Sequence, residues 1–298
     1  MNKNQGLTFS VVFRANSLNY GEGTANISEL KKFHRGNGEV YTFASRQSLR
    51  YDIVRLGNQF FRWNLDVVDK AQGVVQFKPE CTIKDSVEMD LFGYMKTKAN
   101  EGATKRSAVV RLSHAISLEP YRSDLEFLNN MGLAARIDED ANLATLEQHM
   151  SYYTYTVTVD LSRIGVDQGI ELPNEEKASR VKQFLEIVKL LNREIRGRQE
   201  NLAPLFVIGG VYRVPNPFFL GRIALENHDT EKLNLQLIRD TVNTTVFGEP
   251  IKGQTCIGYV KGTFKNEQEL HQLDVAQVGT VDEFFGTLAN EVDAYYGV

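Results

Sequence analysis

The sequence predicts an α+β fold, because strand-like and helix-like apolar patterns follow one another between residues 7 and 211. Alternating apolar and polar residues indicate strands, and apolar residues spaced three or four apart indicate amphipathic helices. The predicted order is strand, helix, strand, strand, helix, strand. That order is typical of a ferredoxin-like sheet, which serves RNA recognition among many unrelated functions and so predicts no activity by itself.

The first strand is predicted at residues 7–13, where large apolar residues alternate with others such as Thr8 and Ser10. This pattern favours a strand with one buried face. A polar, glycine-punctuated stretch at residues 19–38 follows and predicts a long loop that carries a basic cluster.

The first helix begins at a capping residue. Ser45 can cap a helix that we expect to run to about Phe61. Residues 62–104 contain short β-like runs broken by glycine and proline, which predict an irregular insertion. A strand is expected at 109–116, and the polar stretch 129–150 predicts an excursion from the core.

The clearest strand is residues 153–161, where tyrosine, valine and leucine alternate with threonine and aspartate. The second helix is expected to begin near Asn174 and to carry a buried stripe as far as Ile195, with Gly197 as its left-handed end. The other predicted elements are a central strand at 205–211 and, within a partly helical region at 215–298, helices near 231–246 and 281–296.

Composition indicates a globular protein with an uneven distribution of charge. Apolar residues make up 42% and charged residues 24% of the 298 residues, with a formal net charge of −4. Residues 1–62 nevertheless carry nine lysines and arginines against four acids. A basic segment on an acidic body predicts a narrow phosphate-binding track, although chance would give the same asymmetry.

The sequence also predicts a cytoplasmic protein without a membrane partner. No apolar run approaches the roughly 20 residues of a membrane span. The apolar stretch before Arg14 is too short for a signal peptide. Cys81 and Cys256 lie far apart without metal-like spacing, so we expect two reduced thiols.

The most informative segment is Ser45-Arg46-Gln47-Ser48-Leu49-Arg50. A helix amino end has unpaired N–H groups and a positive dipole end, both suited to a phosphate. Arg46 and Arg50 are four residues apart and lie on one helix face, with Ser45 and Gln47 as nearby hydrogen-bonding groups. A capped helix with two solvated arginines is the alternative.

This segment resembles the Ser-x-Gln-Ser-Leu-Lys/Arg helix start of the backbone subunit of type I CRISPR Cascade complexes. Further segments resemble that family in the same order along residues 7–212: Leu18-Asn19 before a glycine-containing loop, Leu91-Phe92-Gly93-Tyr94-Met95, His114-Ala115-Ile116-Ser117 and Tyr152-Tyr153-Thr154-Tyr155. The stretch from Asn16 to Gly23 and the run from Arg111 to Tyr121 are most similar to the DevR family of type I-B systems.

The resemblance implies a hand-like molecule in CRISPR antiviral defence. It implies a ferredoxin-like (RRM-like) palm at 1–61 and 105–214, fingers at 62–104, a thumb β-hairpin at 124–151 and a C-terminal extension at 215–298. Copies of such a subunit form a head-to-tail filament on the guide RNA (crRNA) in a ribonucleoprotein that recognises target DNA. The implied partners are crRNA, target DNA, neighbouring copies and other Cascade subunits.

The resemblance and the basic clusters together give candidate site residues. The RNA-binding candidates are Asn19, Lys31, Lys32, Arg35, Ser45, Arg46, Gln47, Arg50, Met95, Arg106 and His114. The candidate thumb wedge residues are Met131, Leu133, Leu143 and Leu146. Ordinary packing or solvated charge is the alternative for each, and Arg111 could either face nucleic acid or pair with an acid inside the palm.

We expect no catalysis, no cofactor and no metal site. Glu22, Glu29 and Glu39 lie in a loop that by resemblance corresponds to the cleaving loop of type III backbone subunits, but their spacing does not show convergence on a metal. His34 and His114 have no nucleophile at recognisable spacing, and no phosphate-binding glycine loop is present. A metal-dependent target-RNA endonuclease and a scaffold without RNA of its own are the alternatives.

Overall fold

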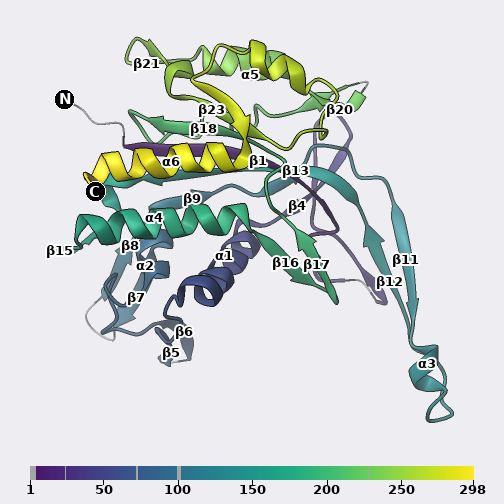
Figure 1. Ribbon diagram of the computed structural model, residues 1–298. Helices are drawn as coiled ribbons and strands as arrows, with labels where there is room; N and C mark the ends of the chain where they lie inside the picture. The colour runs from purple at the N-terminus through teal and green to yellow at the C-terminus, as the bar shows by residue number, and fades with distance from the viewer. Residues whose placement is uncertain (1–4, 24, 72, 99–101, 228) are drawn as a thin grey trace.

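The computed structural model describes residues 5–23, 25–71, 73–98, 102–227 and 229–298. It confirms the α+β class, because a large sheet lies at the centre with helices packed against it (Figure 1). The strands of this nine-stranded sheet are β1 (Gly6–Asn16), β3 (Lys32–His34), β4 (Val40–Ala44), β9 (Val110–Leu112), β10 (Ala115–Ser117), β13 (Met150–Asp160), β18 (Phe206–Tyr212), β23 (Cys256–Tyr259) and β24 (Gln277–Thr280).

Along the sheet the strands follow the order β24-β23-β18-β1-β13-β10-β4-β3, with β9 also paired to β13. Every pair is antiparallel except β23 with β24. The longest pairing joins β1 to β13, from Gly6 opposite Asp160 to Asn16 opposite Met150. The single strand predicted at 109–116 is divided into β9 and β10, both of which pair with β13.

One face of the sheet is covered by the long helices α1 (Arg46–Phe61), α4 (Asn174–Lys189) and α6 (Val281–Tyr296) (Figure 1). Phe9 of β1 contacts Phe284 and Phe285 of α6 edge to face, at centroid distances of 6.3 and 5.8 Å. The prediction of a helix at 281–296 is confirmed. Its first turn is closed by a reciprocal hydrogen-bonded cap between Thr280 and Glu283.

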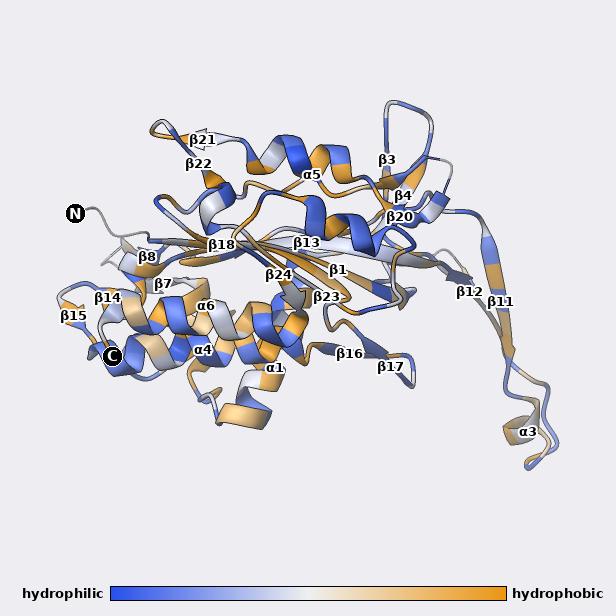
Figure 2. Cartoon of the chain, turned by 45° about the horizontal axis from the view of Figure 1, so that its top comes forward, coloured by the Kyte–Doolittle hydropathy of each residue, from blue (hydrophilic) through white to orange (hydrophobic). Residues whose placement is uncertain are grey.

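The opposite face of the sheet is also covered, which corrects the expectation that the first strand buries one face only. Thr8 and Ser10 point to this second face and are both 0% exposed. Residues 215–273, including α5 (Leu235–Val242), pack a second apolar cluster onto it (Figure 2). The buried Ser10 hydroxyl lies 2.6 Å from the Thr156 hydroxyl, so these two polar groups satisfy each other.

The insertion at residues 62–104 is more regular than predicted. It forms a hairpin, a short helix and the larger part of a second hairpin, made by β5 (Val68–Ala71), β6 (Val74–Phe77), α2 (Val87–Phe92), β7 (Tyr94–Lys98) and β8 (Gly102–Arg106). Ser86 caps α2 by accepting a hydrogen bond from the Met89 N–H. The sequence shows short β-like runs here but not their pairing into hairpins, because each run has too few residues for a clear period.

A long hairpin leaves the body of the molecule at the end opposite β8 (Figures 1 and 2). It consists of β11 (Asp124–Asn129), the short helix α3 (Met131–Ala134) at its tip and β12 (Leu143–Gln148). We call residues 124–148 the arm. A short strand of the preceding loop, β2 (Ile27–Ser28), pairs in parallel with β12 at the base of the arm.

Two predicted helices are shorter than expected. α4 ends at Lys189, because Ile195 belongs to a hairpin in which Arg196 and Gly197 form the turn with φ of 48° and 76°. The helix predicted at 231–246 is reduced to α5, capped by Asn234. The strands of the hairpins not yet described are β14 (Val166–Asp167), β15 (Ile170–Glu171), β16 (Asn192–Ile195), β17 (Arg198–Asn201), β19 (Leu225–Glu226), β20 (Asp229–Leu233), β21 (Thr245–Val246) and β22 (Glu249–Pro250).

Three short 3-10 turns, at Leu161–Arg163, Ile251–Gln254 and Glu267–Gln272, complete the secondary structure of the described residues. Within those residues, none of the helices combines the length and the apolar character needed to cross a membrane.

Candidate nucleic-acid interface

The amino end of α1 is fixed by side chains from two other segments. The Ser45 hydroxyl accepts a hydrogen bond from the Ser48 N–H at 3.2 Å, which confirms the predicted cap. The Asn19 side-chain amide donates to the same hydroxyl at 3.4 Å. The Arg46 N–H donates to Nδ1 of His114 at 3.2 Å. The Gln47 N–H has no partner among the described residues, so one donor of the first turn is open.

His114 links the helix to the sheet. Because its Nδ1 accepts a hydrogen bond, the ring is neutral and carries its proton on Nε2. Burial lowers the pKa of His114, and the positive charges of Arg46 and Lys31 lower it further. The residue therefore serves as a hydrogen-bond acceptor at neutral pH.

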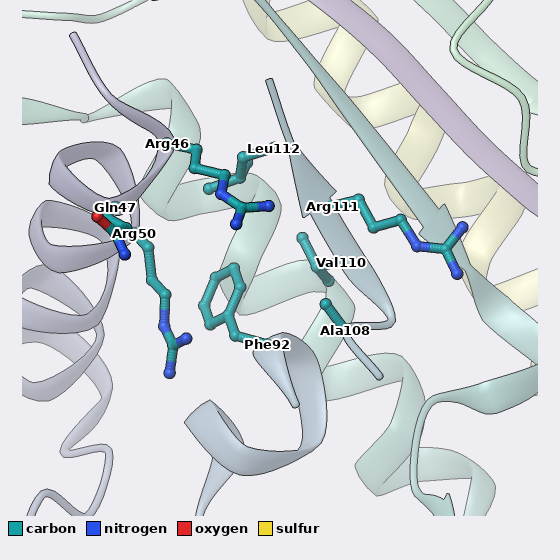
Figure 3. Close-up of a pocket in the computed structure, with 8 residues that line it drawn as sticks. All are labelled: Arg46, Gln47, Arg50, Phe92, Ala108, Val110, Arg111 and Leu112. Atoms are coloured by element: carbon teal, nitrogen blue, oxygen red, sulfur yellow. The ribbon is translucent and has the colours of Figure 1, made fainter. Parts of the chain in front are cut away.

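A cleft of about 420 Å³ lies between the start of α1 and β9 (Figure 3). It is lined by Arg46, Gln47, Arg50, Phe92, Ala108, Val110, Arg111 and Leu112. Figure 3 shows the side chains of Arg46 and Arg50 beside the Phe92 ring, whereas the Arg111 side chain extends away from that ring. The lining of the cleft thus combines arginine side chains with apolar side chains.

The arginines of this cleft differ in how they are paired. Arg46 and Arg111 are exposed, and neither guanidinium has an acidic or hydrogen-bonding partner in the described parts of the chain. Arg50 donates to Glu88 at 2.6 Å and lies 5.3 Å from the centre of the Phe92 ring. Of the predicted pair at the helix start, only Arg46 is therefore free to meet an anion without losing an internal partner.

Arg106 corrects a prediction, because its side chain is only 3% exposed and cannot act as a surface cation. It forms an ion pair with Asp90 at 2.7 Å and donates to the Arg163 carbonyl at 2.8 Å. Arg180 of α4 binds the other oxygen of Asp90 at 2.9 Å. This buried network joins α2, β8 and α4, and a buried charge with such partners is structural.

The basic cluster before β4 also separates into residues of different kinds. Lys31 is half-buried, and its ammonium group has no partner among the described residues. Lys32 binds both carboxylate oxygens of Glu147 at 2.7 and 2.8 Å. Arg35 is exposed and lies over the Tyr41 ring at 5.3 Å. Lys32 is thus committed to the base of the arm, which the sequence did not predict.

Met95 borders a second hollow, of about 710 Å³, formed mainly by the two hairpins of residues 62–106. The side chain is 57% exposed. The hollow shares Arg50 and Phe92 with the first cleft, so the two are continuous along the surface. Met95 is accessible there to a ligand that passes the start of α1.

The arm carries exposed apolar side chains. Met131, Leu133 and Leu143 are 63%, 58% and 51% exposed, whereas Leu146 is 4% exposed. Leu146 pairs with Ser28 of β2 at the covered base of the arm, so it cannot be a wedge residue. Phe127, which is 63% exposed, was missed; its alternation with Leu125 in a short strand was the available signal.

The candidate acids are not clustered with one another or with other potential metal ligands in the described residues. Glu22, Glu29 and Glu39 belong to no group of three or more metal-ligating side chains, and no such group occurs in the part of the chain that the structure describes. The histidines have packing roles instead: His149 accepts or donates with the Thr42 hydroxyl at 2.8 Å, and His114 holds the helix start.

Comparison with known proteins identifies a family and a fold. The model of the family described as "CRISPR-associated negative auto-regulator DevR/Csa2" matches residues 7–232. No curated protein matches the chain. Among solved structures, a chain of a "CRISPR RNA-guided surveillance complex, pre-nicking" is similar with a TM-score of 0.61 and 13% identity, covering 98% of this chain and 99% of that one.

A chain of another "CRISPR RNA-guided surveillance complex" is similar with a TM-score of 0.57 and 15% identity, covering 98% of both chains. At these identities the structural likeness shows the fold. The family match extends over the cleft, the arm and the sheet strands β1 to β18, but not over β23 and β24. The chain therefore belongs to the CRISPR-associated DevR/Csa2 family.

Proposed function

We propose that this protein is a guide-RNA-binding backbone subunit of a type I CRISPR surveillance complex, of the type I-B kind. Family membership supports a CRISPR-associated role, and the similar solved chains come from RNA-guided complexes. In this proposal copies of the chain line up head to tail along the crRNA in the cytoplasm. They contact other subunits and hold the guide for pairing with target DNA.

The architecture supports a hand-like arrangement. The strand order β18-β1-β13-β10, with α1 and α4 on one face, is compatible with the proposed ferredoxin-like palm. Residues 62–104 would be the fingers and the arm the thumb. The exposed apolar residues of the arm support an assembled state, because such side chains are normally covered by a partner. A neighbouring copy is the partner that a filament supplies.

The amino end of α1 is the observation that carries the RNA-binding proposal. An open N–H of Gln47, the unpaired guanidinium of Arg46 and the cleft of about 420 Å³ lie together at one accessible place. Donors and positive charge at a helix start bind a phosphate without reading the base. Binding there would be tolerant of guide sequence.

Replacing Arg46 tests the proposal. We expect Arg46→Ala to weaken binding of single-stranded RNA equally for different sequences. Affinity should also depend less steeply on salt: the magnitude of the slope of log affinity against log salt concentration should fall by about 1, because one phosphate contact is lost. Arg46 suits the test better than Arg50, since Arg50→Ala would also leave Glu88 unpaired.

The matched control is Arg222→Ala. Arg222 is likewise exposed and without a side-chain partner among the described residues, but it lies in the C-terminal layer. This variant should bind RNA as the original protein does. Equal affinity of Arg46→Ala and the original protein across the salt titration would refute binding at the helix start.

We further propose that the subunit is not an enzyme. Its support is the dispersed arrangement of Glu22, Glu29 and Glu39, which belong to no group of three or more potential metal ligands among the described residues. Incubation of the assembled complex with complementary RNA and Mg²⁺ tests this statement. Periodic cleavage that disappears in a Glu22→Ala, Glu29→Ala or Glu39→Ala variant would replace it with a nuclease function.

A further inference from the structure

Aromatic rings gather on one face of the edge hairpin β3–β4. Phe33 is opposite Tyr41 in the register, and Phe43 follows Tyr41 by two residues, so all three rings lie on the same face. Ala44 and Thr42 alternate with them and face the helix side, where Thr42 reaches the Tyr153 hydroxyl at 2.8 Å. The rings therefore occupy the other face of the sheet, at its β3 edge.

These rings form an ordered stack with an accessible outer member. Phe33 and Phe43 are parallel within 14°, with centroids 4.0 Å apart. His114 packs its ring edge to face against both, at 5.8 Å from Phe33 and 5.2 Å from Phe43. Phe43 and His114 are half-buried, but Phe33 remains 38% exposed. The Phe33 ring is thus positioned by Phe43 and His114 and is still partly accessible to a ligand.

Cations surround the stack. Arg35 covers the neighbouring Tyr41 ring at 5.3 Å. Lys31 and Arg46 are near enough to His114 to lower its pKa, and the cationic group of neither residue has a partner among the described residues. A small apolar surface with Lys31, Arg35 and Arg46 nearby suits a polyanion with flat apolar groups. A protein partner would instead require a broader apolar patch.

We propose that Phe33 is a stacking platform for a base of single-stranded RNA, with Lys31 and Arg46 on the adjacent phosphates. The inference rests on the proposed RNA-binding function and adds a base-contacting site to a backbone-contacting one. Every base has a π-face, so stacking is compatible with tolerance of sequence. The His114 ring, which touches both the stack and the start of α1, places the platform beside the phosphate site.

The test compares an RNA that has bases with one that lacks them. The full chain is titrated with a uridine oligomer of about 12 nucleotides, a length within the usual range of single-strand sites, and with an abasic oligomer of the same length and charge. We expect Phe33→Ala to weaken binding of the uridine oligomer about fivefold or more, the factor that corresponds to about 1 kcal/mol of stacking. Binding of the abasic oligomer should not change.

Three further variants separate the loss of stacking from a general effect on folding and from the loss of side-chain volume. Phe60→Ala removes a ring of similar exposure, 42%, at the far end of α1, and should leave both affinities unchanged. Phe33→Leu keeps an apolar side chain on Phe43 but has no flat ring, so it should resemble Phe33→Ala. Phe33→Tyr should bind as the original protein does.

The outcomes distinguish this site from the phosphate site. Equal loss on both oligomers in Phe33→Ala, or unimpaired binding by Phe33→Leu, overturns the platform even if Arg46→Ala behaves as proposed. A loss confined to the uridine oligomer supports the platform, and does so even if Arg46→Ala has no effect and the proposed phosphate site is refuted.

Discussion

The protonation state of His114 affects how the start of helix α1 is held. Its Nδ1 accepts the Arg46 N–H, and its ring supports the Phe33–Phe43 stack. Protonation would replace this acceptor with a donor and place a third positive charge beside Arg46 and Lys31. The structure of the site therefore depends on a neutral ring.

The stability of the protein should fall as the pH drops below about 6.5, the ordinary pKa of histidine. The pKa of His114 is lowered in the folded state, so between the two pKa values the unfolded chain binds more protons and acid favours unfolding. His114→Asn keeps an acceptor that does not titrate. Its thermal midpoint should decline less between pH 7 and pH 5 than that of the original protein.

His34→Asn is the control for this pH series, because the His34 side chain is exposed and makes no hydrogen bond to the described residues. It should retain the full decline. Burial also lowers the pKa of His149, so part of the pH dependence will persist in every variant. Identical curves for His114→Asn and the original protein would contradict the role of the neutral ring.

Single residues show what the sequence can and cannot predict about the site. Ser45 and Arg46 were predictable, because a helix cap and its first turn depend on local sequence alone. Arg106 and Arg111 were not distinguishable, because the buried partner of Arg106 is Asp90, from a different element. Phe33 was missed because the surrounding glycines indicated a loop, whereas the sheet recruits this stretch as an edge strand.

Among the elements, the arm depends on the loop that precedes β3. Glu147 of β12 accepts hydrogen bonds from Lys32 at 2.7 Å and from the Leu30 N–H at 2.7 Å. The Tyr20 hydroxyl donates to the Glu147 carbonyl at 2.9 Å, and β2 extends the hairpin to three strands. A segment that sequence analysis treated as a loop thus supports the base of the arm.

We expect Glu147→Gln to loosen this base while leaving the central sheet intact. The side chains of Lys32 and Glu147 are 20% and 12% exposed, so the lost pair is shielded from solvent. A charged hydrogen bond of this kind contributes about 1.5–3 kcal/mol. Amide hydrogen exchange in β2 and β12 should then be faster by about tenfold or more.

An exposed ion pair elsewhere supplies the comparison for the arm. Asp274, which pairs with Lys252, has a side chain that is 81% exposed. Asp274→Asn should not alter exchange in the arm, because exposed pairs contribute little. Unchanged exchange of β12 in Glu147→Gln would show that strand pairing alone holds the base.

Helix boundaries were predictable where local signals decide them. The helix predicted near 281–296 matches α6, which Thr280 caps in the structure. The end of α4 was placed too far along, because Leu191 and Ile195 continue the helical spacing although the chain has already turned into β16. Leu191 is 0% exposed, so burial is preserved while the backbone conformation changes.

At the scale of the whole molecule, the C-terminal third completes the sheet on its second face. Phe264 is 2% exposed, and its ring lies 5.3 Å from Tyr152 and 6.4 Å from Phe206. β23 and β24 add two strands to the same sheet. Sequence analysis predicted helices in this region but not its packing onto the second face, because the apolar residues that pack there are scattered along the chain.

Phe264→Ala should lower the free energy of unfolding by about 3–5 kcal/mol, the usual cost of removing a fully buried aromatic ring. Chemical denaturation measures this difference. Phe247→Ala provides the comparison, since Phe247 is 74% exposed and its loss should cost no more than about 1 kcal/mol. Similar stability of the Phe264→Ala variant and the original protein would mean that the C-terminal layer is not needed to hold the second face.

The position of Glu147 at the root of a projecting hairpin has a mechanical consequence. The six residues of β12 span about 20 Å, so a tilt of about 5° at the root shifts the tip by about 2 Å. A displacement of this size is large enough to break a hydrogen bond made at the tip. In the proposed filament, Glu147 would therefore affect the spacing between copies through the tilt of the arm, without itself contacting the neighbouring molecule.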